Sequence, residues 1–182
     1  MLQFTLKLYS KIQRPTFDIH CDKIVAMLDT GALYPIWTKS EELLIKLLKA
    51  EYTGKNVPVS GFGGTTTGKV YIIPLLQVGK INYTNMHIVV SDNLGKVPFS
   101  IILSATMFQG LIYEIDTVNN CFNVTIPNNE SSIRNYKVID SMGQINILCQ
   151  SVKETETKQF NKALTKEDIN ANYINKLIKN SK

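Results

Sequence analysis

The stretch that decides the fold is Val25-Ala26-Met27-Leu28-Asp29-Thr30-Gly31-Ala32. An apolar run within residues 17–28 leads directly to a carboxylate and a tight Thr-Gly turn. Wholly apolar strands are buried on both faces, so the pattern predicts one strand over residues 17–28 that delivers Asp29 to the interior. A buried carboxylate is costly unless other groups pair with it or donate hydrogen bonds to it. This setting favours a functional Asp29 over an ordinary surface turn, which the same residue types also form.

The segments around this stretch are predicted to be mostly strands. Residues 2–8 alternate between apolar and polar side chains, which is typical of a half-buried strand. Pro74 places its own strand at a sheet edge or a bulge. The remaining expected elements are a Gly-rich hairpin at 57–69, a second hairpin of strands 69–78 and 81–90 joined at Gly79-Lys80, strands at 98–103, 111–116 and 121–126, and a helical turn at 104–109.

One helix of about three turns is expected over residues 38–50. Thr38 and Glu41 have the spacing of a capping box, and the apolar face is formed by Leu43, Leu44, Leu47 and Leu48. The predicted fold class is therefore all-β, with one or two short helices. We expect a domain over residues 1–127 and a C-terminal extension over residues 128–182. The extension is expected to hold one or two strands in residues 133–150, a polar linker at 151–164, and an amphipathic helix capped by Thr165 and Asp168.

Composition limits the classes of function. The 182 residues are 44% hydrophobic, which suits one folded domain with a short appendage. The net charge of +5 comes mainly from scattered lysines, whereas nucleic-acid readers usually cluster their basic residues, so we expect no nucleic-acid partner. No apolar run is long enough for a membrane span, and no signal peptide is recognisable at the N-terminus, so we expect no membrane association.

Cys21, Cys121 and Cys149 are widely separated and form no metal-binding pattern with the two histidines. We therefore expect thiols in a reducing compartment, a cytoplasmic protein, and no metal or other cofactor. The abundance of Asn, Ile and Lys is typical of an AT-rich genome and favours a bacterial source.

Three motifs follow one another along the chain: the loop Leu28-Asp29-Thr30-Gly31-Ala32, the Gly-rich segment Val59-Ser60-Gly61-Phe62-Gly63-Gly64-Thr65, and the string Ile101-Ile102-Leu103-Ser104-Ala105. In this order they resemble the motifs of the retropepsin-like (retroviral-type) aspartic proteases, the single-lobe relatives of the pepsins. The resemblance covers about residues 2–125. Ser104 departs from the family pattern, which usually has glycine there. Serine is small enough for many such sites unless the backbone requires a positive φ.

The resemblance implies an acid-protease barrel with one lobe per chain and Asp29 as the catalytic carboxylate. Thr30, Gly31 and Ala32 would support the loop, with Thr30 reaching across a two-fold axis and Gly31 presenting its amide to the carboxylate. Ser60, Gly61, Phe62, Gly63 and Gly64 would form a flap over a peptide or protein substrate. Ile102, Leu103 and Ser104 would lie beside the active loop.

One aspartate is insufficient for this chemistry, in which two carboxylates share a proton and activate a water molecule. No second Asp-Thr-Gly string follows, since Asp116-Thr117-Val118 and Asp140-Ser141-Met142 both lack the glycine. The sequence therefore predicts a homodimer that brings Asp29 of two chains together in one active site.

Two alternatives remain open at this point. The chain could be a non-catalytic dimerisation or peptide-binding module that kept the fold, which Ser104 and the long extension favour. Residues 63–69 also fit G-x-x-x-x-G-K of a phosphate-binding loop. Val70 stands where that loop needs Ser or Thr, and the following residues are strand-like, which argues against nucleotide binding.

Overall fold

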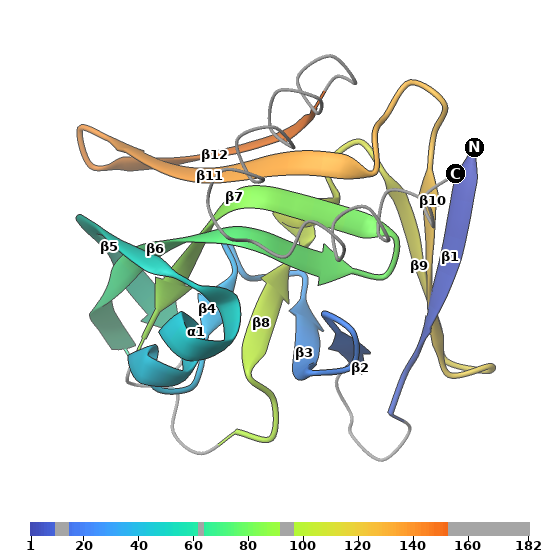
Figure 1. Ribbon diagram of the computed structural model, residues 1–182, viewed down its shortest axis with the longest axis horizontal. Helices are drawn as coiled ribbons and strands as arrows, with labels where there is room; N and C mark the ends of the chain where they lie inside the picture. The colour runs from blue at the N-terminus through green and yellow to red at the C-terminus, as the bar shows by residue number, and fades with distance from the viewer. Residues whose placement is uncertain (10–14, 62–63, 92–96, 153–182) are drawn as a thin grey trace.

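The computed structural model describes residues 1–9, 15–61, 64–91 and 97–152. These residues are mostly strands, accompanied by helix α1 (Glu41–Leu48) and the 3₁₀ turn η2 (Ala105–Phe108) (Figure 1). The predicted all-β class, with one or two short helices, is thereby confirmed. The expected C-terminal helix and nearly all of the polar linker lie outside the described residues.

A small antiparallel sheet joins the start of the chain to a later hairpin. Its order is β1-β10-β9, and Leu2 of β1 pairs with Ile126 of β10. In β1 the polar residues Gln3 and Thr5 are exposed while Phe4 between them is buried, so the expected half-buried strand is present. The bounds are β1 (Leu2–Lys7), β9 (Ile112–Asp116) and β10 (Cys121–Ile126).

A large mixed sheet carries the rest of the fold. Its main path runs β12-β11-β7-β4-β8-β3-β2. Off this path, β6 pairs with β7, and β5 pairs with β6. The central strands β3 and β8 are parallel neighbours and largely buried, which explains their apolar sequences. The bounds are β2 (Thr16–Ile19), β3 (Ile24–Asp29), β4 (Ile36–Trp37), β5 (Glu51–Gly61), β6 (Gly64–Val78), β7 (Ile81–Val90), β8 (Ile101–Ser104), β11 (Ile133–Ser141) and β12 (Gln144–Ser151).

The prediction of one strand over residues 17–28 is wrong. The segment is a hairpin, in which Ile19 of β2 pairs with Ile24 of β3. His20, Cys21 and Asp22 have φ of 53°, 56° and 59°, so three successive residues in the left-handed region reverse the chain. The reversal lets both β2 and β3 bury their apolar residues and leaves the polar turn between them at the surface.

Helix α1 is shorter than predicted and begins with a different cap. Ser40, not Thr38, is the N-cap, and its hydroxyl accepts a hydrogen bond from the Leu43 amide at 3.4 Å. The Thr38 hydroxyl instead donates to the Phe99 carbonyl at 2.6 Å. The helix has eight residues and buries Leu44 and Leu48, whereas Leu43 is exposed.

The two expected hairpins around β6 are present. The first joins β5 to β6, with Gly61 opposite Gly64 at its turn end. The second joins β6 to β7 through Gly79 and Lys80. A side chain at Gly79 would overlap the Phe4 ring, 2.1 Å from the position of its Cβ, so glycine is required for packing as well as for its φ of +58°. Pro74 follows the end of the pairing between β5 and β6, in agreement with an edge position.

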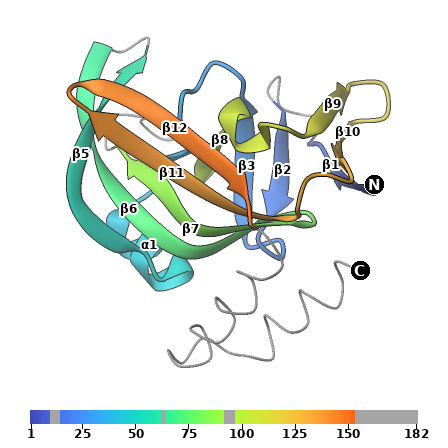
Figure 2. The same cartoon turned by 90° about the horizontal axis from the view of Figure 1, so that it is seen from above.

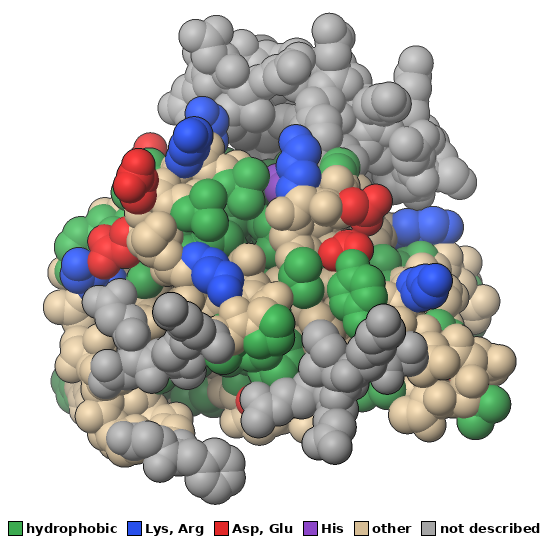
Figure 3. Space-filling model, turned by 90° about the horizontal axis from the view of Figure 1, so that it is seen from below, with side chains coloured by type: hydrophobic (Ala, Val, Ile, Leu, Met, Phe, Trp, Pro, Cys, Tyr) green, Lys and Arg blue, Asp and Glu red, His purple; other side chains and the backbone are tan. Residues whose placement is uncertain are grey.

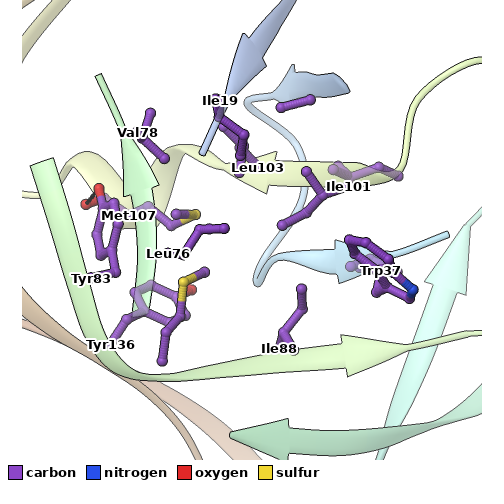
Figure 4. Close-up of a cluster of buried hydrophobic side chains, with 14 of the residues drawn as sticks. Ile19, Trp37, Leu76, Val78, Tyr83, Ile88, Ile101, Leu103, Met107 and Tyr136 are labelled. Carbon is purple, nitrogen blue, oxygen red and sulfur yellow. Dashed lines mark hydrogen bonds between the residues drawn. The ribbon is translucent and has the colours of Figure 1, made fainter. Parts of the chain in front are cut away.

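The strands expected after Pro127 form the hairpin β11–β12, which joins the large sheet through parallel pairing of β11 with β7. Arg134 and Tyr136 of β11 are fully buried. Figure 4 shows Tyr136 among side chains of the core that include Tyr83 of β7 and Met107 of η2. The hairpin is therefore part of the same packed core, and the boundary at residue 127 stays a prediction.

Candidate functional site

Asp29 is the last residue of β3 and lies beside the last residue of β8, since Asp29 and Ser104 are register partners. The residue is half-buried, although Leu28 before it is buried. Its carboxylate oxygen Oδ1 accepts a hydrogen bond from the Gly31 amide at 2.9 Å, and its carbonyl accepts one from the Ala32 amide at 3.2 Å. A tight turn therefore holds the carboxylate at the end of a rigid central strand.

The turn itself reaches the surface of the chain. Thr30 and Gly31 are exposed, and Leu33 is 50% exposed although it is apolar. Tyr34 returns to the interior, where its hydroxyl donates to the Pro58 carbonyl of β5. The loop thus presents its tip outward, while its end is fixed to β5 at Pro58, three residues before Gly61 at the turn of the β5–β6 hairpin.

The end of β8 supports the loop from the side. Ile102, Leu103 and Ser104 are all buried, and they pair in register with Met27, Leu28 and Asp29. Ser104 has a φ of −88°, an ordinary extended conformation, so this position does not require glycine for its backbone. Its hydroxyl donates to the Ala32 carbonyl at 2.5 Å and accepts from the Thr106 amide at 3.1 Å.

The expected flap residues lie at the turn end of the β5–β6 hairpin. Ser60 and Thr65 are cross-strand partners whose hydroxyl oxygens are 3.0 Å apart. Gly64 has a φ of +103°, which side chains rarely tolerate. Phe62 and Gly63 lie outside the described residues. Seen from above, the hairpin end and the loop after β3 lie on the same side of the molecule (Figure 2).

The phosphate-loop alternative is not supported. Residues 64–78 form the continuous strand β6, whereas a phosphate-binding loop needs a helix N-terminus directly after it. The Lys69 ammonium is 2.7 Å from a Glu41 carboxylate oxygen, in an ion pair that ties β6 to α1. That hydrogen bond is the main reason why the pKa of Glu41 is lowered, with a second contribution from the Tyr71 hydroxyl.

Three residues at the site were missed from the sequence: Tyr34 at the end of the loop, Thr106 beside the loop, and Tyr136, which contacts Thr106. The Thr106 hydroxyl in η2 donates to the Leu33 carbonyl at 3.1 Å, and the Tyr136 hydroxyl oxygen is 2.7 Å from Thr106 Oγ1. Thr106 follows the third motif by one residue, which was the only local signal. Tyr136 comes from β11, far along the chain, and only tertiary structure brings it here.

Charged side chains are dispersed on the face drawn in Figure 3. There, Lys and Arg lie among Asp, Glu and hydrophobic side chains and do not form one continuous basic area. No disulfide joins Cys21, Cys121 or Cys149. Within the part of the chain that the structure describes, no three His, Cys, Asp or Glu side chains are grouped to hold a metal ion. Among those same residues, no helix is long and apolar enough to cross a membrane.

A comparison with solved structures finds a likeness in structure. The chain is similar to a retropepsin-like aspartic protease from Rickettsia conorii, with 19% sequence identity and a TM-score of 0.46, over 69% of this chain and 91% of that one. No family model matches the chain, and no curated protein matches it in sequence.

Proposed function

We propose that the chain is one subunit of a homodimeric aspartic endopeptidase whose active site holds Asp29 from both subunits. The observation that carries this proposal is the setting of Asp29. A buried central strand ends in this carboxylate, and the next turn donates the Gly31 amide to it at 2.9 Å. The strings at Asp116 and Asp140 differ, because these residues lie at hairpin turns and the strands that lead to them are not buried as β3 is.

The need for a partner follows from the chemistry and is supported by the surface of the loop. Two nearby carboxylates cannot both ionise, so they share one proton. The ionised carboxylate takes a proton from a bound water while the protonated one polarises the peptide carbonyl. The chain contains one Asp-Thr-Gly string. The exposed Thr30, Gly31 and Leu33 beside Asp29 form a surface that a second copy covers across a two-fold axis.

The turn end of the β5–β6 hairpin is the substrate flap in this proposal. Its residues Ser60, Gly61, Phe62, Gly63 and Gly64 close over an extended peptide, which excludes water from the reaction. The Tyr34 contact to Pro58 supports this assignment, because it links this hairpin, three residues before Gly61, to the loop that carries Asp29. The substrate is a peptide or protein, no cofactor is required, and a cytoplasmic location stays a prediction of the sequence.

The alternative of a non-catalytic module has lost one of its supports. Ser104 favoured that alternative as a departure that could distort the loop. Its ordinary backbone and its 2.5 Å hydrogen bond to the Ala32 carbonyl are instead compatible with a well-held loop. The enzyme therefore remains the function that the geometry supports best.

The proposal is tested by hydrolysis of a peptide library with wild-type protein and Asp29→Asn. We expect the substitution to lower turnover by at least roughly 10²–10⁴ and to leave the melting temperature nearly unchanged. Asp116→Asn and Asp140→Asn are matched controls, since they alter carboxylates in other turns. Turnover in Asp29→Asn within about tenfold of wild type would exclude this role for Asp29.

A further inference from the structure

The carbonyls that follow Gly31 are held by side chains of the segment after β8. Ser104 is fully buried and donates its hydroxyl hydrogen to the Ala32 carbonyl at 2.5 Å. Thr106, two residues later in η2, donates to the Leu33 carbonyl at 3.1 Å. The two hydroxyl oxygens are 2.7 Å apart, and the pair holds two adjacent peptide groups of the loop.

A third residue, from the β11–β12 hairpin, joins this pair. Tyr136 of β11 is fully buried, and its hydroxyl oxygen is 2.7 Å from Thr106 Oγ1. Burial raises the pKa of Tyr136, so the phenol keeps its hydrogen at neutral pH. A carbonyl can only accept, and each hydroxyl has one hydrogen. Because the Thr106 hydrogen is directed to Leu33, Tyr136 is the donor to Thr106.

Tyr136 is itself fixed in place by the sheet and by its neighbours. Arg134 and Asn135 of β11 pair in register with Tyr83 and Thr84 of β7. The buried Arg134 guanidinium also donates to the Glu130 carboxylate at 2.9 Å and to the Gln109 carbonyl just after η2. The donor end of the hydroxyl chain is therefore attached to a rigid part of the core.

We propose that Ser104, Thr106 and Tyr136 are positioning residues for the proposed active loop. A hydroxyl chain runs from Tyr136 through Thr106 to the Leu33 carbonyl, and Ser104 donates beside it to the Ala32 carbonyl, so that the β11–β12 hairpin fixes the peptide groups after Gly31. This inference rests on the proposed function and gives residues 133–151 a part in it. These hydroxyls do not touch Asp29. They act by holding the turn whose Gly31 amide binds the Asp29 carboxylate.

The decisive variants are Tyr136→Phe and Thr106→Val, which remove one hydroxyl each, with Thr106→Ser as the conservative rescue. We expect the first two to lower kcat about tenfold with little change in KM, because misplacing a catalytic group by 1 Å costs up to roughly 10²-fold. Thr106→Ser keeps the hydroxyl and is expected to retain wild-type kcat. Assays are run at a protein concentration at which sedimentation shows dimers.

Tyr83→Phe is the matched control for Tyr136→Phe. Tyr83 is another fully buried tyrosine whose hydroxyl donates to η2, but it donates to the Met107 carbonyl at 2.8 Å and not to the Thr106 hydroxyl. Both variants are expected to lower the melting temperature, and only Tyr136→Phe is expected to lower kcat. Equal losses of kcat in the two variants, or an unchanged kcat in Tyr136→Phe, would overturn the positioning role.

Ser104→Gly gives a test against the family pattern. If serine is merely tolerated where relatives have glycine, this variant keeps full turnover, which would contradict the proposal for Ser104. We expect about a tenfold loss of kcat instead, within the range for a displaced catalytic group.

A second readout separates this inference from the proposed function. Amide hydrogen exchange at Gly31 and Ala32 reports the turn directly and needs no peptidase activity. We expect faster exchange there in Tyr136→Phe than in Tyr83→Phe. Faster exchange in a protein without peptidase activity would refute the enzyme and retain the hydroxyl chain. Unchanged exchange together with unchanged kcat in an active enzyme would refute the role of the hydroxyl chain and leave the proposed function standing.

Discussion

At the scale of single residues, Gly31 is required for space and not for an unusual backbone. Its φ lies outside the left-handed region, but a Cβ there would be 3.3 Å from Asp29 Oδ1. Gly31→Ala is therefore expected to leave unfolding free energy unchanged or raise it by about 0.4–1 kcal/mol. The added methyl crowds the carboxylate, so turnover should fall roughly tenfold or more. Urea unfolding and peptide hydrolysis of one preparation check both parts, and full turnover in a stable Gly31→Ala protein would contradict this account of the site.

The residues of the site differ in how far the sequence could predict them. The position of Asp29 at the end of a buried strand follows from local pattern, because apolar residues precede it and turn formers follow it. The conformation of Ser104 does not follow, since the same serine could have met a backbone that excludes it. Tyr136 could not be found at all, because its contact with Thr106 depends on the parallel pairing of β11 with β7.

At the scale of secondary-structure elements, the two described glycines of the flap make a matched pair. A Cβ added at either position would meet open space, but only Gly64 has a positive φ, at +103°. Gly64→Ala is expected to cost about 1–3 kcal/mol of local backbone strain and to lower turnover. Gly61→Ala should change neither quantity appreciably. Equal turnover in the two variants, measured with one peptide substrate, would argue against a closing role for this hairpin end.

The β11–β12 hairpin is stabilised by an ion pair whose contribution depends on pH. Glu130 accepts hydrogen bonds from Ser151 and from Arg134, and these lower its pKa, with Ser151 the larger cause. A carboxylate with a lowered folded pKa stabilises the protein above its unfolded pKa. That contribution is lost as pH falls through the folded pKa.

Glu130→Gln removes this charge beside the buried Arg134. We expect it to lower the unfolding free energy at neutral pH by about 1.5–3 kcal/mol, the value of a hydrogen bond to a charged group. The difference from wild type should shrink toward acid pH. Urea unfolding at several pH values measures it, and a difference that stays constant down to acid pH would show that the carboxylate charge is not the cause.

Elements were predictable where local pattern alone decides them. The hairpin at Gly79-Lys80 and the pair β9 and β10 could be located because turn residues separate apolar runs. The error at residues 17–28 arose because the polar His20-Cys21-Asp22 group was treated as part of a strand. Three successive left-handed residues without glycine are rare, so the usual turn signals did not mark the reversal.

At the scale of the whole molecule, the proposed active site exists only in the dimer. Peptidase activity per subunit should therefore fall on dilution, in parallel with the dimer fraction. Sedimentation and activity measured over the same concentration series check this. A species that is monomeric at every concentration and fully active throughout would be incompatible with a shared site.

The central claim, that one site uses Asp29 from two chains, is tested most directly by mixing subunits. Wild-type protein and Asp29→Asn are unfolded together in equal amounts, refolded, and assayed at constant total concentration. Random pairing gives about a quarter of the wild-type turnover if both carboxylates are required, because only one pairing in four keeps both. About half of the wild-type turnover would mean that each chain works alone, and that result would contradict the account.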